Sequence, residues 1–131
     1  MSYAGALRRS WAKPARGRRP GRKKGMNGLE ADYAHVLNAR VASGEVLWWV
    51  FESVTLKLAE DTRYTPDFFV MLTSGELEGH EVKGGIFEDD AKVKAKVAAA
   101  LFPFRFVIAR RALKRDGGGW STQEVSDGQA R

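Results

Sequence analysis

Apolar residues between about Gly28 and Ser43 recur at intervals of three and four, the spacing of one face of an α-helix. The residues on that face are Leu29, Tyr33, Val36, Leu37 and Val41. Asn27 stands where an N-cap is expected, and Gly44 is of the type that commonly ends a helix. The pattern predicts a helix that buries a single stripe.

The next stretch, residues 45–59, is interpreted as one long strand whose apolar side chains first occupy both faces and then only one. With strict alternation, Val46, Trp48 and Val50 share a face that continues toward residue 58. Such a doubly apolar start is buried on both sides or covered by a partner chain. We therefore expect Trp48 and Trp49 in a core or interface rather than against nucleobases.

Two shorter strands follow, each introduced by a polar turn. Pro66 cannot donate a ladder hydrogen bond, so it marks the start or edge of the first, which carries Asp67. The second carries Glu81 and Lys83, which share a face because strand side chains alternate with period 2. The three strands are predicted to form a meander.

A second helix is predicted from about Glu88 to Leu101, and Pro103 ends it. Its expected inner stripe comprises Val93, Val97, Ala100 and Leu101. Residues 104–109 then form a short apolar run, interpreted as a buried strand that returns parallel to the sheet, and residues 120–125 suggest a small edge strand. These elements predict an α/β fold of the α+β type with a mixed sheet: helix, three-strand meander, helix, strand.

Charge is distributed unevenly along the 131 residues, whose formal net charge is +6. Residues 1–25 contain no acid and carry Arg8, Arg9, Lys13, Arg16, Arg18, Arg19, Arg22, Lys23 and Lys24. The remaining chain has thirteen basic and sixteen acidic residues. We predict a flexible basic arm over 1–25 and a single domain over 26–131. The arm suits contact with phosphate backbones, and the alternative is a solubilising or targeting role.

Asp67 stands among apolar and aromatic residues, where a carboxylate without a binding partner is costly. Together with Glu81 and Lys83 it gives the two carboxylates and the ammonium that a metal-dependent phosphodiester hydrolase needs. Taken singly, Asp67 can be a turn acid, and the other two a weak surface ion pair. Glu30, in the first helical turn, either completes a cap with Asn27 or supplies a third carboxylate.

The order Pro66-Asp67, hairpin, Glu81-Val82-Lys83 resembles the PD-(D/E)xK nuclease signature. The similarity extends over residues 27–110 to the endonuclease I type of bacteriophage Holliday-junction-resolving enzyme. The segments that carry it are Asn27-Gly28-Leu29-Glu30, Tyr64-Thr65-Pro66-Asp67-Phe68, Glu81-Val82-Lys83-Gly84 and Glu88-Asp89-Asp90.

This resemblance implies a restriction-endonuclease-like core and Mg²⁺- or Mn²⁺-dependent DNA cleavage. Asp67, Glu81 and the Val82 carbonyl would hold the metal, with Glu30 serving a second ion, and Lys83 would be the catalytic lysine. It also implies 5′-phosphate and 3′-hydroxyl products. A homodimer, in which strands are exchanged in the family, would resolve Holliday junctions during DNA recombination by paired nicks.

Four further basic residues are expected to hold branched or duplex DNA by its backbone, without reading bases. They are Lys92, Lys96, Arg110 and Arg111. The two lysines lie four residues apart on one helix face, and an ordinary solvated role is the alternative for each.

The two histidines are expected to matter less. His80 neighbours the site and could assist proton transfer, but it lies on the strand face opposite Glu81. His35 is interpreted as an ordinary helix residue.

Other features narrow the possible classes of protein. The chain has no cysteine, which excludes disulfides, thiolate zinc sites and cysteine nucleophiles. No apolar run is long enough to span a membrane, and no signal-peptide pattern follows the basic start. We expect a cytoplasmic protein, in the host cytoplasm if phage-encoded. Two alternative functions remain: a nuclease of the same fold for non-branched DNA, and a non-catalytic, basic-tailed DNA-binding protein.

Overall fold

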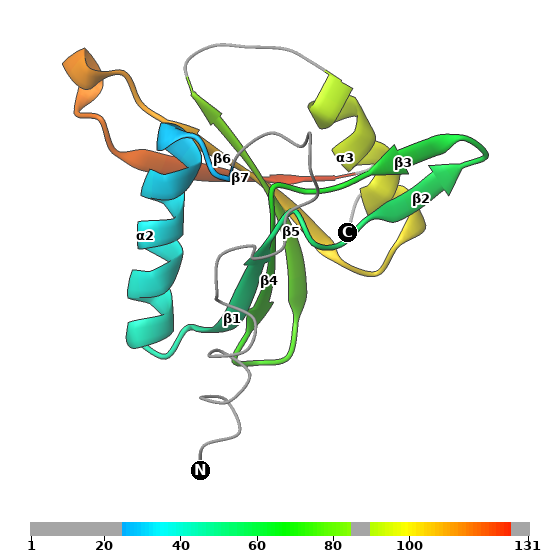
Figure 1. Cartoon of the computed structure of the whole chain (residues 1–131), viewed down its shortest axis with the longest axis horizontal. Coiled ribbons are helices and arrows are strands. Elements are labelled where there is room, and N and C mark those ends of the chain that lie inside the picture. The colour runs from blue at the N-terminus through cyan, green and yellow to red at the C-terminus, as the bar shows by residue number, and fades with distance from the viewer. Residues whose placement is uncertain (1–24, 85–89, 127–131) are drawn as a thin grey trace.

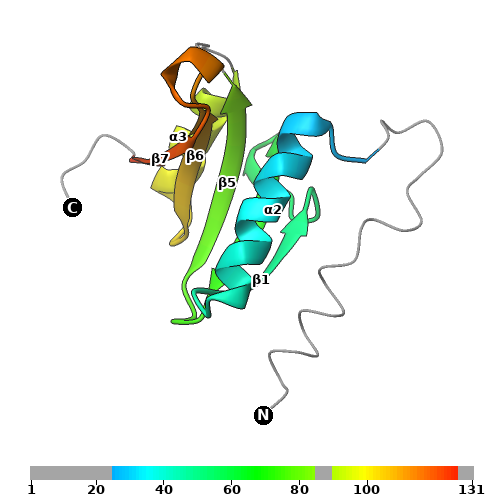
Figure 2. The ribbon, with the colours of Figure 1, turned by 90° about the vertical axis from the view of Figure 1, so that its left-hand side faces the viewer.

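A computed structural model describes residues 25–84 and 90–126 of the chain, which form two helices and a five-stranded sheet with a small hairpin beside it. In chain order the elements are α2 (Gly28–Ala42), β1 (Val46–Phe51), β2 (Leu56–Ala59), β3 (Thr62–Tyr64), β4 (Phe68–Leu72), β5 (Leu77–Gly84), α3 (Asp90–Leu101), β6 (Arg105–Arg111), the 3₁₀ turn η1 (Lys114–Asp116) and β7 (Trp120–Val125). Helix α2 covers one face of the sheet and α3 the other (Figures 1 and 2). The predicted mixed α+β architecture is confirmed.

The strand order in the sheet is β1-β4-β5-β6-β7. Strands β1, β4 and β5 pair antiparallel in turn, which is the predicted meander. Strand β6 returns parallel to β5 after α3, and β7 closes the sheet as an antiparallel edge strand. Both of these placements agree with the sequence prediction.

The sequence pattern placed α2 within one residue of its observed end. Asn27 and Glu30 form a reciprocal capping box, in which each side chain accepts a hydrogen bond from the backbone N–H of the other. Tyr33 and Leu37 are fully buried on the predicted inner stripe, and Ala34 is buried beside them. The helix is therefore held by its cap and by one packed face.

The prediction of a long strand over 45–59 was wrong. Glu52 has a positive φ of 48°, which ends β1 and turns the chain out of the sheet. The residues beyond it form β2, which pairs with β3 in a separate two-stranded hairpin. An apolar alternation that continued across the break concealed it in the sequence.

The predicted face assignment within β1 was also wrong at its start. The register against β4 shifts between Val46 and Trp48, so a bulge interrupts the strict alternation. Val46 and Trp49 consequently pack in the same core cluster beneath α2. The indole N–H of Trp49 donates to Asn38 Oδ1 of α2 at 3.0 Å, so this tryptophan belongs to the core.

The predicted inner stripe of α3 was wrong as well. The helix instead buries its small residues Ala95, Ala98 and Ala99, whereas Val93 is 59% exposed. The exposed large residues on the helix are Val93, Val97 and Leu101. Phe106 and Ile108 of the sheet fill the same core cluster. A helix can pack directly over these large side chains when the residues that face them are small, as alanines are.

Several predictions fall on residues outside the described ranges: the arm up to Lys24, the start of the second helix at Glu88, and the last five residues. In the part of the chain that the structure describes, no helix is both long and apolar enough to cross a membrane.

Candidate active site

One end of the sheet brings together the start of α2, the end of β1, the start of β4 and the end of β5. Helix α2 has fifteen residues and β1 six, which correspond to about 22 Å and about 20 Å. The two elements run in opposite directions, so the first turn of α2 lies beside the end of β1 (Figure 1). Antiparallel register places Phe51 beside Phe68 and Phe68 beside His80, so β4 begins and β5 approaches its end at the same place.

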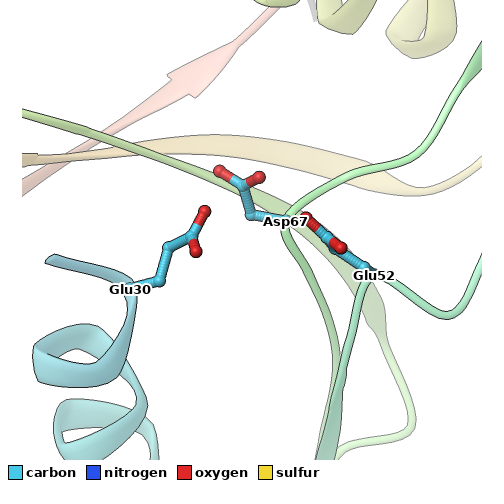
Figure 3. A group of neighbouring side chains, drawn as sticks. All are labelled: Glu30, Glu52 and Asp67. Carbon is cyan, nitrogen blue, oxygen red and sulfur yellow. The ribbon is translucent and has the colours of Figure 1, made fainter. Parts of the chain in front are cut away.

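Three carboxylates meet at this end of the sheet. Glu30, Glu52 and Asp67 each place one oxygen within 4.8 Å of those of the other two, and all three side chains are half-buried. Figure 3 shows them coming from the start of α2, the end of β1 and the start of β4. Of the acids predicted to bind metal, the structure thus places Glu30 and Asp67 in one cluster.

Glu30 both completes the helix cap and lies in the carboxylate cluster. Its Oε1 accepts the Asn27 backbone N–H at 3.0 Å, and its own backbone N–H donates to Asn27 Oδ1 at 2.8 Å. The same carboxylate belongs to the acidic cluster. The cap therefore fixes the direction in which the Glu30 side chain leaves the helix.

Glu52 is the member of the cluster that the sequence reasoning missed. Its backbone N–H donates to the Asp67 carbonyl at 2.9 Å, which locks the end of β1 to the start of β4. A non-glycine residue with positive φ is uncommon and often marks a functional position. The available signal was its place in the sequence, because Glu52 interrupts the apolar series between Val50 and Val54.

Asp67 lies at the centre of the site. Oδ2 accepts the Val82 backbone N–H at 2.9 Å, which ties Asp67 to the strand segment that carries the predicted carbonyl ligand. Burial raises the pKa of Asp67, the Glu30 charge adds to the rise, and the Val82 N–H and Lys83 oppose it. Next to it, fully buried Pro66 packs against Gly79, where an added Cβ would lie 3.2 Å from the proline ring.

Glu81 and Lys83 occupy the neighbouring strand as predicted. Lys83 Nζ lies 3.8 Å from Glu81 Oε2, and the Tyr64 hydroxyl donates to Glu81 Oε1 at 2.7 Å. Burial raises the pKa of Glu81 to about 7, and the Asp67 carboxylate contributes to that rise. Tyr64 and Lys83 act in the opposite direction. The buried Glu81 and Asp67 carboxylates therefore interact electrostatically.

His80 lies on the other face of the sheet, as predicted, within a polar network beneath α2. Its Nε2 lies 2.8 Å from Glu78 Oε1, and its Nδ1 lies 2.7 Å from the Tyr33 hydroxyl. A neutral imidazole that donates from Nε2 and accepts at Nδ1 satisfies both contacts. Burial lowers the pKa of His80, and Arg105 pairs with Glu78 at 3.2 Å. Both ring nitrogens of His80 are thus engaged within this network, on the strand face opposite Glu81.

The structure distinguishes the two arginines of the second basic cluster. Arg110 is the register partner of Lys83, so the two point to the same face of adjacent parallel strands. Arg111 instead forms a 2.7 Å ion pair with Asp32 and stacks over Trp120 at 5.1 Å. Of the two, Arg110 lies on the face that carries the predicted catalytic lysine.

The remaining residues predicted to contact DNA are two lysines of α3 and the basic residues of the arm. Lys96 is exposed on α3, and Lys92 is partly buried. The nine basic residues of the arm lie outside the described ranges.

A groove of about 520 Å³ adjoins the site. Its lining includes Leu29 and Gly84, the sequence neighbours of Glu30 and Lys83, together with Arg111 and Lys114. Two basic residues thus line a groove next to the segments that carry Glu30 and Lys83.

The donor set of the cluster fits a hard divalent cation. Carboxylate oxygens are the ligands that Mg²⁺ and Mn²⁺ prefer. Burial and neighbouring carboxylates raise the pKa values of Asp67 and Glu81 although Lys83 lies nearby, so a further positive charge would favour ionisation of both. Glu30, Glu52 and Asp67 would hold the ion, with Glu81 beside them.

Comparisons with known protein families, with curated proteins and with solved structures found no match to this chain.

Proposed function

We propose that this protein is a metal-dependent endodeoxyribonuclease of the PD-(D/E)xK type, with branched DNA as its substrate. One observation carries the proposal. Asp67 lies between a carboxylate cluster shared with Glu30 and Glu52 and a carboxylate–ammonium pair formed by Glu81 and Lys83. Structural ion pairs do not require four acids in one partly buried site, whereas phosphodiester hydrolysis uses such a concentration of carboxylates.

A bound divalent ion would supply Lewis-acid polarisation of a phosphoryl oxygen and make a coordinated water more acidic. The protein's own groups orient the reactants. Lys83 offers its ammonium group beside Glu81, where it can neutralise negative charge that develops on the phosphate. Arg110, on the same face of the next strand, extends this positive region along the DNA backbone.

The preference for junctions rests on the resemblance to the endonuclease I type of resolving enzyme. Resolution of a four-way junction needs two coordinated nicks, so it requires two active sites and a symmetric dimer. The basic residues of the arm would then add affinity for DNA without selecting a sequence.

The test compares a fluorescently labelled four-way junction with a linear duplex of the same sequence, each incubated with protein and Mg²⁺. We expect cleavage of the junction that depends on Mg²⁺ and is lost in Asp67→Asn. Asp61→Asn is the matched control because Asp61 is an exposed turn residue with a φ of 65°, a conformation that Asn tolerates. Equal cleavage of both substrates would support a nuclease for non-branched DNA, and binding without cleavage by the wild type would refute the enzymatic assignment.

A further inference from the structure

Tyr64, the last residue of the β2–β3 hairpin, hydrogen-bonds to Glu81 in the candidate active site. It is 4% exposed, and its hydroxyl donates to Glu81 Oε1 at 2.7 Å. Lys83 lies near the other oxygen of the same carboxylate. The two oxygens of Glu81 are thus approached from two different strands, and only one of these strands belongs to the main sheet.

The hairpin holds this tyrosine firmly. The hydroxyls of Thr55 and Thr65 are 2.7 Å apart and close the base of the hairpin. Lys94 of α3 donates to the Arg63 carbonyl at 2.9 Å, next to Tyr64 in the chain. Tyr64 also pairs in register with Leu56, and both are buried in the core cluster beneath α3. A phenol fixed in this way defines where the Glu81 carboxylate can point.

Glu81 needs such an external constraint. It is a flexible side chain, buried to 6% exposure, and burial together with the adjacent Asp67 carboxylate raises its pKa, so its ionised form is unfavourable beside Asp67. Without a fixed donor, the side chain can rotate away from Asp67 and separate the two charges. A hydroxyl that donates to one oxygen holds the carboxylate near Asp67 and leaves its remaining lone pairs available.

We propose that Tyr64 is a positioning residue, which orients Glu81 for the divalent ion, and that the inserted β2–β3 hairpin contributes to the reaction through it. This inference rests on the proposed function, because it assigns Tyr64 a role at the same metal site. Tyr64 itself touches neither ion nor substrate in this scheme and acts only through Glu81.

The test is a calorimetric titration of the full-length protein with Mn²⁺ alone, for wild type and Tyr64→Phe. The phenylalanine retains the ring that packs 6.3 Å from Phe106, so the fold is preserved and only the hydroxyl is lost. We expect the Mn²⁺ dissociation constant to rise roughly tenfold, as expected when a carboxylate loses a hydrogen bond. The Mg²⁺ concentration for half-maximal cleavage should rise in parallel, with most of kcat recovered at saturating Mg²⁺.

Tyr33→Phe is the matched control, because Tyr33 is equally buried and its hydroxyl lies 2.7 Å from His80 on the opposite face of β5. It should lower the melting temperature without changing Mn²⁺ affinity. A second control repeats Tyr64→Phe in a Glu81→Gln background, where the substitution should have no further effect on Mn²⁺ affinity.

The outcomes separate this inference from the proposed function. Wild-type affinity in Tyr64→Phe, or an equal loss of affinity in the Glu81→Gln background, would overturn the role of Tyr64 and leave the metal site intact. A wild type that binds no Mn²⁺ would overturn both. A wild type that binds Mn²⁺ but does not cleave would overturn only the nuclease assignment.

Discussion

His80 and Glu81 are adjacent in β5, both are buried, and their surroundings differ in a way that separates structure from function. On the α2 face, His80 lies between Tyr33 and Glu78, and Arg105 pairs with Glu78, so every polar group has a partner of suitable charge. On the α3 face, Glu81 adjoins Asp67. One network is complete within the protein, whereas the other concentrates negative charge.

The contrast between the surroundings of His80 and Glu81 indicates how a binding site can be recognised without a ligand. Burial of polar groups is tolerated when partners satisfy them, as for His80. Burial and neighbouring carboxylates raise the pKa values of Asp67 and Glu81, which costs stability, and a cation can relieve that cost. Substitutions in each network test this contrast.

Replacing His80 by leucine breaks the complete network. Tyr33 and Glu78 would each lose a hydrogen-bond partner in a buried position, which we expect to destabilise the fold by about 3 kcal/mol. Thermal unfolding should show a decrease in Tm of more than about 10 °C. His35→Leu, at an exposed helix position, should change Tm little, and a similar loss in both variants would contradict the structural role of the network.

Replacing Glu52 by glutamine weakens the acidic cluster without removing side-chain volume. We expect Mg²⁺-dependent DNA cleavage to fall about 100-fold, because one of the three clustered carboxylates loses its charge. Glu60→Gln is the control, since Glu60 is exposed and forms only a 3.5 Å surface pair with Lys57. Equal activity of both variants would exclude Glu52 from the site.

Replacing Glu81 by glutamine should stabilise the metal-free protein at high pH. In the folded state the pKa of Glu81 is raised from 4.5 to about 7, so between these values the unfolded chain ionises while the native state stays protonated. Stability is therefore lost as the pH rises through this interval and remains lower above it. In denaturant unfolding, the free energy of unfolding of the variant should exceed that of the wild type by about 2 kcal/mol near pH 8 and equal it near pH 4. A difference independent of pH would contradict the raised pKa.

Glu30 allows its two roles to be separated. Glutamine can retain the capping box, so Glu30→Gln should keep wild-type stability while Mg²⁺-dependent cleavage falls. Alanine removes the cap as well, and Glu30→Ala should unfold with about 1 kcal/mol less free energy than Glu30→Gln. Equal cleavage by Glu30→Gln and wild type would restrict this residue to its capping role.

Much of the fold could be predicted because the sequence signals for its helices and strands are local. The capping pair Asn27 and Glu30, the turns and the alternation around Glu81 each depend on a few neighbouring residues. Strand β6 was identified from a short apolar run, and its parallel return followed from the intervening helix.

The errors share a different cause, because each depends on contacts between distant segments. The backbone turn at Glu52 is locked by the Asp67 carbonyl, which no local pattern near residue 52 encodes. Helix α3 turns its alanines inward because Phe106 and Ile108 already fill the space below it. Two of the three clustered acids, Glu30 and Asp67, were predicted from the sequence, whereas Glu52 required the three-dimensional fold.

The most direct test of the central claim is calorimetric titration of Mn²⁺ into the wild type and into Asp67→Asn near pH 8, where Glu81 is ionised. We expect saturable Mn²⁺ binding by the wild type and by the Asp61→Asn control, and a complete loss of that binding in Asp67→Asn. Undiminished binding in Asp67→Asn, or no binding by the wild type, would contradict the central claim.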